Sequence, residues 1–233
     1  DYKVHSKLTL ITSRVDGKYH YLTQIGTGNY NEKTSELYTD LSFITTRQSI
    51  GEEANAVFNN MALQRLTSEA DTMLVAPLRF KTVLLEEMDR QIALAMQGKP
   101  ASIILKNNSI NDPQIIAKIS EASCAGVRVD MIVRGICCVR AGVPGRTENV
   151  HIRSIVGRYL EHSRIYCFGS GDNMRIYIAS GDFLTRNTER RVEVGVRVDD
   201  PAIAKKLRGI LDLQLRDTVN AREMQPVGAY NKG

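Results

Sequence analysis

Two histidines lie in similar short motifs far apart in the chain. His5 belongs to the stretch VHSKLTLI, and His162 belongs to EHSRIYCF. In each stretch a serine and then a cation follow the histidine, and mostly apolar residues come next. Side chains at i and i+2 of a strand point to the same face. We therefore expect His5 to lie beside Lys7, and His162 to lie beside Arg164.

The similarity between the two stretches continues beyond the histidines. Each strand is followed by a hairpin partner that ends in a turn of small residues, GTGN at 26–29 and ASGD at 179–182. A lone H-x-K motif is weak and is satisfied by many solvated strands. Two of only four histidines, however, occupy equivalent points of one internal repeat. The repeat therefore favours a functional interpretation of both histidines.

The chemistry that this pattern suits is phosphoryl transfer. A neutral imidazole nitrogen is a good nucleophile toward phosphorus near pH 7. The nearby cation, here Lys7 or Arg164, binds the non-bridging oxygens of the transferring group. Backbone N–H groups of a glycine-rich turn and the Asn29 carboxamide complete a phosphate cradle. If the two repeats meet face to face, His5 and His162 approach one phosphorus from opposite sides.

The composition is that of an ordinary globular protein with a polyanionic ligand. The chain has 233 residues, 42% of them hydrophobic and 24% charged, with a net charge of +5 and a pI of about 9.0. Six arginines but no lysine occur between Arg134 and Arg164. Arginine suits bidentate phosphate binding. No apolar run approaches the ~18 residues of a membrane span, and the four cysteines lack zinc-site spacing.

Strands and helices alternate along the chain, which predicts an α/β fold, and several hairpin signals make the sheet mixed. We expect a first unit at 1–70, truncated at its N-terminal side, and a second unit at 71–233. A capping box of Ser49 and Glu52 predicts a helix start near residue 49. Asp112 and Pro113 predict another. The last fifteen residues resemble a loose tail.

Longer blocks carry a more specific resemblance. HSKLTLI, GTGNYNEKTSELYTDLSFIT, VRGICC, GVPG, SIVGRYLEHSRIY and TRNTERRVEVGVRV occur in this order. Paired H-x-K strands resemble the phospholipase D superfamily. Together the blocks resemble the C-terminal half of bacterial polyphosphate kinases of the phospholipase-D-like type, over nearly the whole chain. The resemblance implies reversible transfer of the ATP γ-phosphate to polyphosphate (EC 2.7.4.1) through a phosphohistidine.

The resemblance also implies roles for individual residues. His5 matches the phosphorylated histidine. Tyr38 of ELYTD, Arg134 of VRG and His162 of EHSR match ATP-contacting residues. From the repeat we add three phosphate-binding candidates: Lys7, Asn29 and Arg164. The family's magnesium-associated arginines lie upstream of residue 1, so no metal ligand is expected within this chain.

The same resemblance implies partners and a location. These are ATP, ADP and polyphosphate rather than nucleic acid, in a cytoplasmic homo-oligomer, with association at the inner membrane face left open. We expect this chain alone to be inactive or weak, because strands that should flank His5 are missing. Two alternatives remain: a phosphodiesterase or nuclease that uses the same histidines, and a polyanion-binding module without catalysis. Arg164 in place of the second lysine argues against the hydrolase.

Overall fold

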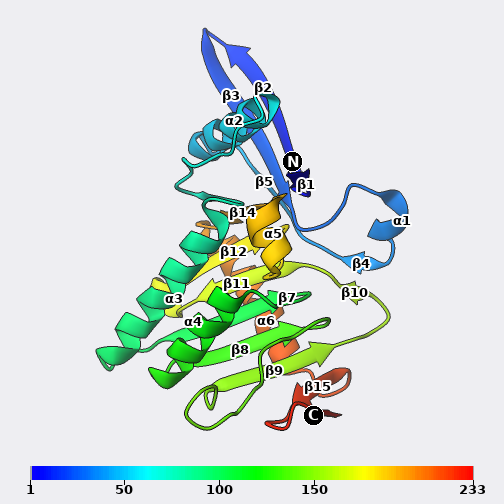
Figure 1. Ribbon diagram of the computed structural model, residues 1–233. Coiled ribbons are helices and arrows are strands. Elements are labelled where there is room, and N and C mark those ends of the chain that lie inside the picture. Colours follow the sequence, from blue (N-terminus) through cyan, green and yellow to red (C-terminus); the bar gives the residue numbers. More distant parts are fainter. Residues whose placement is uncertain (1, 233) are drawn as a thin grey trace.

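A computed structural model describes residues 2–232 of the chain (Figure 1). The helices are α1 (Glu32–Ser35), α2 (Gln48–Ala62), α3 (Phe80–Met96), α4 (Pro113–Cys124), α5 (Thr185–Arg190) and α6 (Pro201–Leu215), with one 3₁₀ turn (Gly171–Asn173). The strands are β1 (Lys3–Val4), β2 (Leu8–Val15), β3 (Lys18–Gly26), β4 (Tyr38–Thr39), β5 (Ser42–Thr45), β6 (Met73–Val75), β7 (Ser102–Asn107), β8 (Arg128–Val133), β9 (Val150–Ile155), β10 (Leu160–Glu161), β11 (Arg164–Phe168), β12 (Arg175–Ala179), β13 (Arg191–Val192), β14 (Val194–Arg197), β15 (Ala221–Met224) and β16 (Tyr230–Lys232).

A nine-stranded mixed sheet forms the centre of the second unit. Its strand order is β16-β15-β9-β8-β7-β11-β12-β14-β6. The pairs β7·β8 and β8·β9 are parallel, and the other pairs are antiparallel. The mixed sheet expected from the hairpin signals is therefore present.

Helices cover both faces of this sheet. Helices α3 and α4 pack on one face, where Phe80, Leu84 and Ile115 join a fully buried core with the strands. Helix α6 lies on the other face, as Figure 1 shows, and shares a second core with α2. Asp112 caps α4 as the sequence predicted, because its side chain accepts hydrogen bonds from the N–H groups of Gln114 and Ile115.

A long hairpin of β2 and β3 projects from this body together with α2 (Figure 1). Its turn is at Asp16 and Gly17, both with positive φ, as a two-residue hairpin turn requires. Strand β5 completes a three-stranded sheet, β2-β3-β5. Helix α2 lies so close to it that a Cβ on Gly51 would be 2.2 Å from Cβ of Tyr21. The absence of a side chain at Gly51 therefore allows α2 to pack closely against the hairpin.

The two units repeat the same order of elements. In the first, hairpin β2–β3 is followed by β5 and α2; in the second, hairpin β11–β12 is followed by β14 and α6. Strands β5 and β14 each pair antiparallel with the second strand of their hairpin. The units differ at one edge: β11 also pairs with β7, whereas β2 pairs only with β3 among residues 2–232. The internal repeat in the sequence is thus a repeat of structure.

Two local predictions were wrong. The final residues form β15 and β16, and β15 pairs with β9 to extend the large sheet. The apolar Ala221, which is buried, anchors this extension. Helix α2 starts at Gln48, close to the predicted position, but the predicted capping box is absent: Ser49 lies within the first turn, and the N-cap is Arg47 without a side-chain cap.

Candidate active site

His5 is positioned by a strand pairing between the two units. Strand β1 runs parallel to β13, with Val4 opposite Val192, and the His5 N–H donates to the Val192 carbonyl at 3.0 Å. Glu193 follows Val192 directly in the chain. The histidine of the first unit is therefore placed against an acid of the second unit.

His162 is positioned by the reciprocal pairing. Strand β10 runs parallel to β4, with Glu161 opposite Thr39, and the His162 N–H lies 3.3 Å from the Thr39 carbonyl. The residue that follows Thr39 is Asp40. Each unit therefore provides a histidine to the other and receives one, a pseudo-twofold exchange that requires both units.

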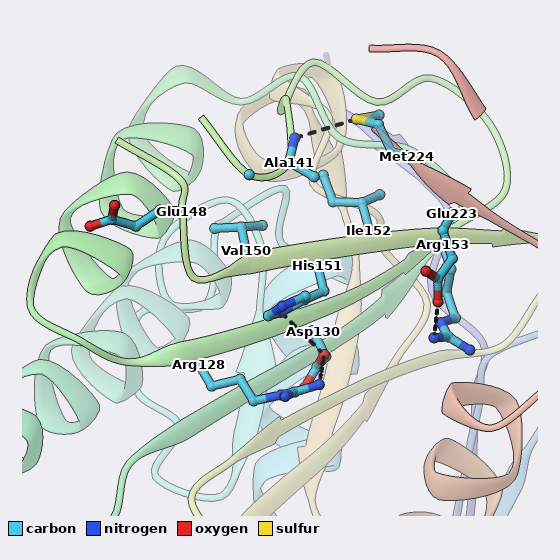
Figure 2. Close-up of a pocket in the computed structure, with 11 residues that line it drawn as sticks. Arg128, Asp130, Ala141, Glu148, Val150, His151, Ile152, Arg153, Glu223 and Met224 are labelled. Carbon is cyan, nitrogen blue, oxygen red and sulfur yellow. Dashed lines mark hydrogen bonds and ion pairs between the residues drawn. The ribbon is translucent and has the colours of Figure 1, made fainter. Parts of the chain in front are cut away.

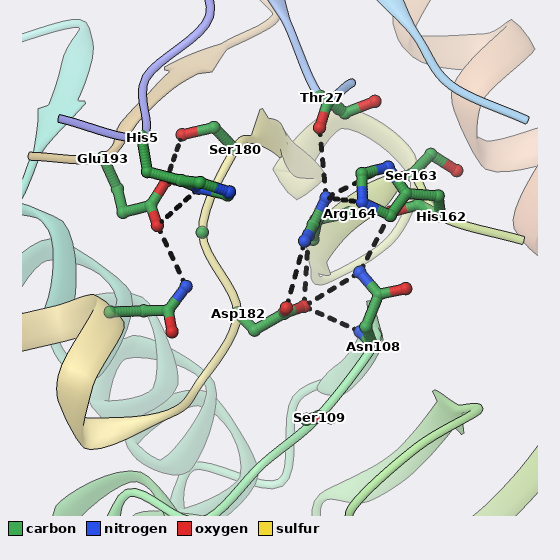
Figure 3. A network of polar contacts seen from close by, with 12 residues as sticks. His5, Thr27, Asn108, Ser109, His162, Ser163, Arg164, Ser180, Asp182 and Glu193 are labelled. Atoms are coloured by element: carbon green, nitrogen blue, oxygen red, sulfur yellow. Dashed lines mark hydrogen bonds and ion pairs between the residues drawn. The ribbon is translucent and has the colours of Figure 1, made fainter. Parts of the chain in front are cut away.

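Both imidazole rings contact the carboxylate of the opposite unit. Nδ1 of His5 lies 3.0 and 2.9 Å from the two Glu193 oxygens, and Nδ1 of His162 lies 2.9 Å from both Asp40 oxygens (Figure 3 draws the first pair). An ionised carboxylate only accepts hydrogen bonds, so each Nδ1 carries the proton. The lone pair is then on Nε2, the tautomer that a nucleophile or proton acceptor at Nε2 needs.

A hydroxyl group from the small-residue turn holds each carboxylate. Thr27 Oγ1 donates to Asp40 at 2.7 Å, and Ser180 Oγ donates to Glu193 at 2.6 Å. Each hydroxyl also accepts the N–H of the residue after the acid, at 2.9 Å for Leu41 and 3.0 Å for Val194. The same arrangement of a hydroxyl, a carboxylate and a backbone N–H therefore occurs in both units.

A glycine follows each of these hydroxyl residues, and the carboxylate occupies the space of its absent side chain. A Cβ on Gly28 would lie 2.1 Å from an Asp40 oxygen, and a Cβ on Gly181 would lie 2.9 Å from Cγ of Glu193. Neither glycine has a positive φ. The glycines are therefore required here by close approach and not by backbone conformation.

The two cations beside the histidines have different partners. Lys7 Nζ lies 3.2 Å from both ring nitrogens of His5 and donates to the His5 carbonyl at 2.5 Å. Arg164 forms two hydrogen bonds with Asp182, at 3.1 and 3.0 Å, and another to the Thr27 carbonyl at 3.0 Å (Figure 3). Its Nη1 also lies 3.1 Å from Nε2 of His162.

Electrostatics follow from this burial and pairing. Burial lowers the pKa of Lys7 to about 8 despite the nearby Glu193 carboxylate. For Asp182, burial alone would raise the pKa, but the charge of Arg164 outweighs it and holds that pKa below its usual value. Burial and the Arg164 charge lower the pKa of His162 even though Asp40 opposes them. His162 is therefore neutral at neutral pH.

A second group of polar residues connects Arg134 to His162. Arg134 Nε donates to the Asn108 side-chain oxygen at 2.6 Å, and Asn108 Nδ2 donates to the His162 carbonyl at 3.1 Å and to Asp182 at 3.1 Å. The Tyr38 ring lies against the His162 ring, with centroids 5.0 Å apart and a tilt of 49°. The structure thus brings Tyr38 and Arg134 together with His162; their contact with ATP stays a prediction.

A cavity of about 280 Å³ opens beside this cluster. Tyr38, Asp40, Gly28 and Asn29 contribute to its lining, so it lies on the first-unit side of His162. A cavity of about 230 Å³ at the β8–β9 edge, shown in Figure 2, contains none of the predicted site residues. Most of its charged groups pair with one another, as Arg128 does with Asp130 and Arg153 with Glu223. The cavity lined by Tyr38 and Asp40 is therefore the one that adjoins the predicted site residues.

The predicted residues all lie in this region, although Asn29 makes no side-chain hydrogen bond within residues 2–232. Several other residues of the site were missed. Asp40, Glu193, Thr27, Ser180, Asp182 and Asn108 were not selected from the sequence. One signal existed: Thr27 to Asp40 and Ser180 to Glu193 are both intervals of 13 residues. A comparison of the two repeats beyond the small-residue turn would have found both acids.

Two further properties concern metals and membranes. Within the described part of the chain, 2–232, no group of three or more His, Cys, Asp or Glu side chains could hold a metal ion. None of the helices there is both long and apolar enough to cross a membrane. The four cysteines are free thiols.

Comparison with known proteins places this geometry in a family. The profile described as "Polyphosphate kinase C-terminal domain 2" matches residues 73–233, and "Polyphosphate kinase C-terminal domain 1" matches 1–67. A polyphosphate kinase of Staphylococcus haemolyticus is 42% identical over 98% of this chain and 32% of that protein. One of Pseudomonas aeruginosa is 39% identical over 99% and 34%. The chain spans about a third of the length of these curated relatives.

Solved structures agree with this assignment. A crystal structure of polyphosphate kinase from Porphyromonas gingivalis superposes with a TM-score of 0.93 and 31% identity, over 99% of this chain and 36% of that one. A phosphatidylserine synthase from Haemophilus influenzae, at 10% identity, covers 88% of this chain and 62% of its own with a TM-score of 0.54, a likeness of fold alone. The predicted mixed α/β fold with two pseudo-repeated units is confirmed. The chain belongs to the polyphosphate kinase family, of which it contains C-terminal domains 1 and 2.

Proposed function

We propose that the full-length protein containing this chain transfers the γ-phosphoryl group of ATP reversibly to the end of polyphosphate, through a phosphohistidine on His5. The observation that carries this proposal is the pair of histidines, each fixed by a carboxylate of the opposite unit. Named relatives and the site chemistry support the same reaction class. ATP and ADP are the proposed nucleotides.

In the first step, the Nε2 lone pair of His5 attacks the γ-phosphorus. The new N–P bond forms as the bond to the bridging oxygen breaks, and ADP leaves with that electron pair. The ring becomes positively charged and keeps its Nδ1 proton, and the buried Glu193 carboxylate compensates that charge. Lys7 lies beside Nε2, where it stabilises the non-bridging oxygens of the phosphoryl group.

In the second step, a terminal oxygen of polyphosphate attacks the same phosphorus and the N–P bond breaks. The chain grows by one phosphate, and neutral His5 is restored. His162, whose pKa is lowered by burial, is neutral, and its Nε2 takes the proton of a protonated terminal oxygen as that oxygen enters; in the reverse reaction it returns this proton to the leaving oxygen. Tyr38 contributes a ring face for the base of ATP, while Arg134 binds nucleotide phosphates, with Asn29 and Arg164 as further phosphate contacts.

Magnesium neutralises phosphate charge in reactions of this class. Within residues 2–232 no cluster of three or more His, Cys, Asp or Glu side chains could hold a metal ion, and we derive no step through magnesium. We further propose a cytoplasmic homo-oligomer that contacts the inner membrane face. Sedimentation of the full-length protein, and its partition between cytosol and membrane fractions, would test both.

Labelling with γ-³²P-ATP tests the proposal. On the full-length protein we expect acid-labile, alkali-stable label. His5→Gln should abolish this label. His162→Gln should slow labelling by about 10²–10⁴-fold, with the remaining label on His5. Phosphate recovered on His162 in the His5→Gln protein would reverse the assignment.

The same preparation discriminates the two other functions. Cleavage of a phosphodiester substrate without phosphoenzyme would support a nuclease. Salt-sensitive polyanion binding without any turnover would support a binding module. Residues 1–233 alone should form polymer poorly, since a group misplaced by ~1 Å costs ~100-fold; efficient synthesis by this chain would refute that expectation.

A further inference from the structure

Lys106 is a buried cation that no step of the proposed reaction uses. It lies on β7 and is only 1% exposed. Its Nζ donates to the carbonyl oxygen of Ser163 at 2.8 Å and contacts the Ser163 hydroxyl at 2.8 Å. Its side chain therefore ends against the backbone between His162 and Arg164.

The position is costly for an ammonium group, because burial removes its hydration. The charge is only partly compensated: a Glu161 oxygen lies 3.6 Å from Nζ, and the same carboxylate accepts a hydrogen bond from Gln214 at 2.6 Å. A hydrophobic residue of similar length would fill this space at lower cost. The ammonium group must therefore contribute something other than packing.

The neighbouring residues show what that contribution is. Asn108, two positions further along the same segment, donates to the His162 carbonyl, and Lys106 donates to the next carbonyl, that of Ser163. Two successive peptide groups of the His-Ser-Arg segment are thus held by β7 and by the residue that follows it. In the first unit, Lys7 of the motif itself donates to the His5 carbonyl. In the second unit, Arg164 is occupied by Asp182 and Thr27 and makes no such bond.

We infer that Lys106 is a positioning residue: by holding the Ser163 peptide it orients the His162 ring toward Asp40 and the substrate phosphate. The catalytic consequence rests on the proposed function, whereas the orientation of His162 does not. The charges around Lys106 come from three elements: Glu161 on β10, Arg164 on β11 and Asp40 after β4. Burial lowers the pKa of Lys106 to about 8, so the ammonium form still predominates at neutral pH.

Kinetics of Lys106→Met in the full-length enzyme test the catalytic consequence. Methionine keeps the length and loses the donor. We expect kcat to fall by about 10- to 100-fold, because His162 is no longer held in register, while KM for ATP stays near that of the wild type. Lys118→Met, which removes a partly buried lysine paired with Asp89 and Glu121, is the matched control and should leave kcat unchanged.

A double variant separates position from stability. Lys106→Met leaves Glu161 without its cation, and Lys106→Met/Glu161→Gln removes that leftover charge. The double variant should recover thermal stability but not kcat. Recovery of kcat together with stability would overturn the positioning role.

Chemical rescue gives a further arm. Lys106→Ala creates a space that propylamine can enter, whereas methionine fills that space. Propylamine should therefore raise kcat of Lys106→Ala and not that of Lys106→Met. Equal effects on both variants would contradict the inference.

A readout without turnover tests orientation directly. In the ¹⁵N-histidine-labelled 233-residue chain, the Nδ1 proton shared by His162 and Asp40 should give a low-field resonance. Lys106→Met should shift or broaden this resonance and leave the His5 resonance in place. An unchanged His162 resonance would overturn the inference, even if the full-length protein proved to lack phosphotransferase activity, a result that would instead refute the proposed function.

Discussion

Arg164 and Asp182 form a bidentate ion pair, with N–O distances of 3.1 and 3.0 Å, in the cradle where the first unit has Lys7 and Asn29. The registers are equivalent, because Arg164 pairs with Ala179 as Lys7 pairs with Gly26. Arg164 is thus neutralised by Asp182 of the turn in its own unit, whereas the corresponding turn beside Lys7 contains no acid. A phosphoryl group carries negative charge, so the site whose cation has no ion-pair partner in its own turn is the one that retains it. This asymmetry supports His5 as the nucleophile.

The first prediction concerns a variant that neutralises Lys7. Asn29→Asp should reproduce the second unit's ion pair beside Lys7 and slow labelling of His5 by about 10²-fold, as loss of one oxyanion contact does. The rate of ³²P incorporation in the full-length enzyme measures it. Asn31→Asp adds the same charge two residues away, at the N-cap of α1, and is the control. Equal slowing by both variants would mean that only net charge matters.

The second prediction concerns the acids that fix the two rings. Glu193→Gln and Asp40→Asn retain size but cannot compensate a positive ring, so each should lower kcat by about 10²–10⁴-fold. Only Glu193→Gln should also reduce the amount of phosphohistidine at equilibrium, since Glu193 faces His5. Asp199→Asn, which alters a surface ion pair with Arg197, should do neither. Full activity of Glu193→Gln would show that the tautomer is set otherwise.

The third prediction uses the glycines beside these acids. Gly28→Ala and Gly181→Ala place a methyl group against Asp40 and Glu193, so each should displace a carboxylate and reduce kcat by about 10²-fold. Gly209→Ala on α6 meets no atom within 4 Å. It should raise the free energy of unfolding by about 0.5–1 kcal/mol. Thermal melts and steady-state rates measure both; an active Gly28→Ala enzyme would contradict the close approach.

The fourth prediction separates nucleotide binding from chemistry. Tyr38→Ala should raise KM for ATP several-fold, as loss of one stacked aromatic does, and Tyr38→Phe should do little. Arg134→Ala should weaken binding of both ATP and ADP, because arginine binds phosphates through charge and fork geometry. Titration calorimetry measures these affinities. If Tyr38→Phe were as damaging as Tyr38→Ala, the hydroxyl would be the active group.

The fifth prediction is that the contribution of Lys106 to stability grows at alkaline pH. Burial lowers the pKa of Lys106 from 10.5 to about 8. Between these values the unfolded chain binds a proton that the folded protein has lost, so the free energy of unfolding increases with pH. Lys106 should contribute on the order of 2 kcal/mol between pH 8 and 10.

Urea unfolding at both pH values measures this contribution. Lys106→Met should show a smaller increase from pH 8 to 10 than the wild type. In Lys118→Met the increase should remain, because hydrogen bonds to Asp89 and Glu121 raise the pKa of Lys118, and its stabilisation persists up to 10.5. An unchanged increase in Lys106→Met would show that the lysine is not desolvated.

The amino-acid sequence by itself determined the repeated His-Ser-cation strands, their hairpins and the mixed α/β class. These features are local: alternation of apolar residues, the Asp16–Gly17 turn and the Asp112–Pro113 helix start depend on residues close in the chain. The internal repeat then identified His5, His162, Lys7 and Arg164 without any tertiary information.

Only the tertiary structure decided which groups complete each histidine. Glu193 is 188 residues from His5, and Asp40 is 122 residues from His162. Their contact depends on two short parallel pairings between units, which no local pattern predicts, because two-residue strands have almost no sequence signal. Burial, too, is a property of the assembled fold. A lysine is usually exposed, and nothing in the sequence around Lys106 predicts otherwise. Lys106 becomes a buried cation near His162 only when β7 pairs with β11. The sequence therefore identified the reacting groups, and the packing of the two units determined their tautomers, charges and orientation.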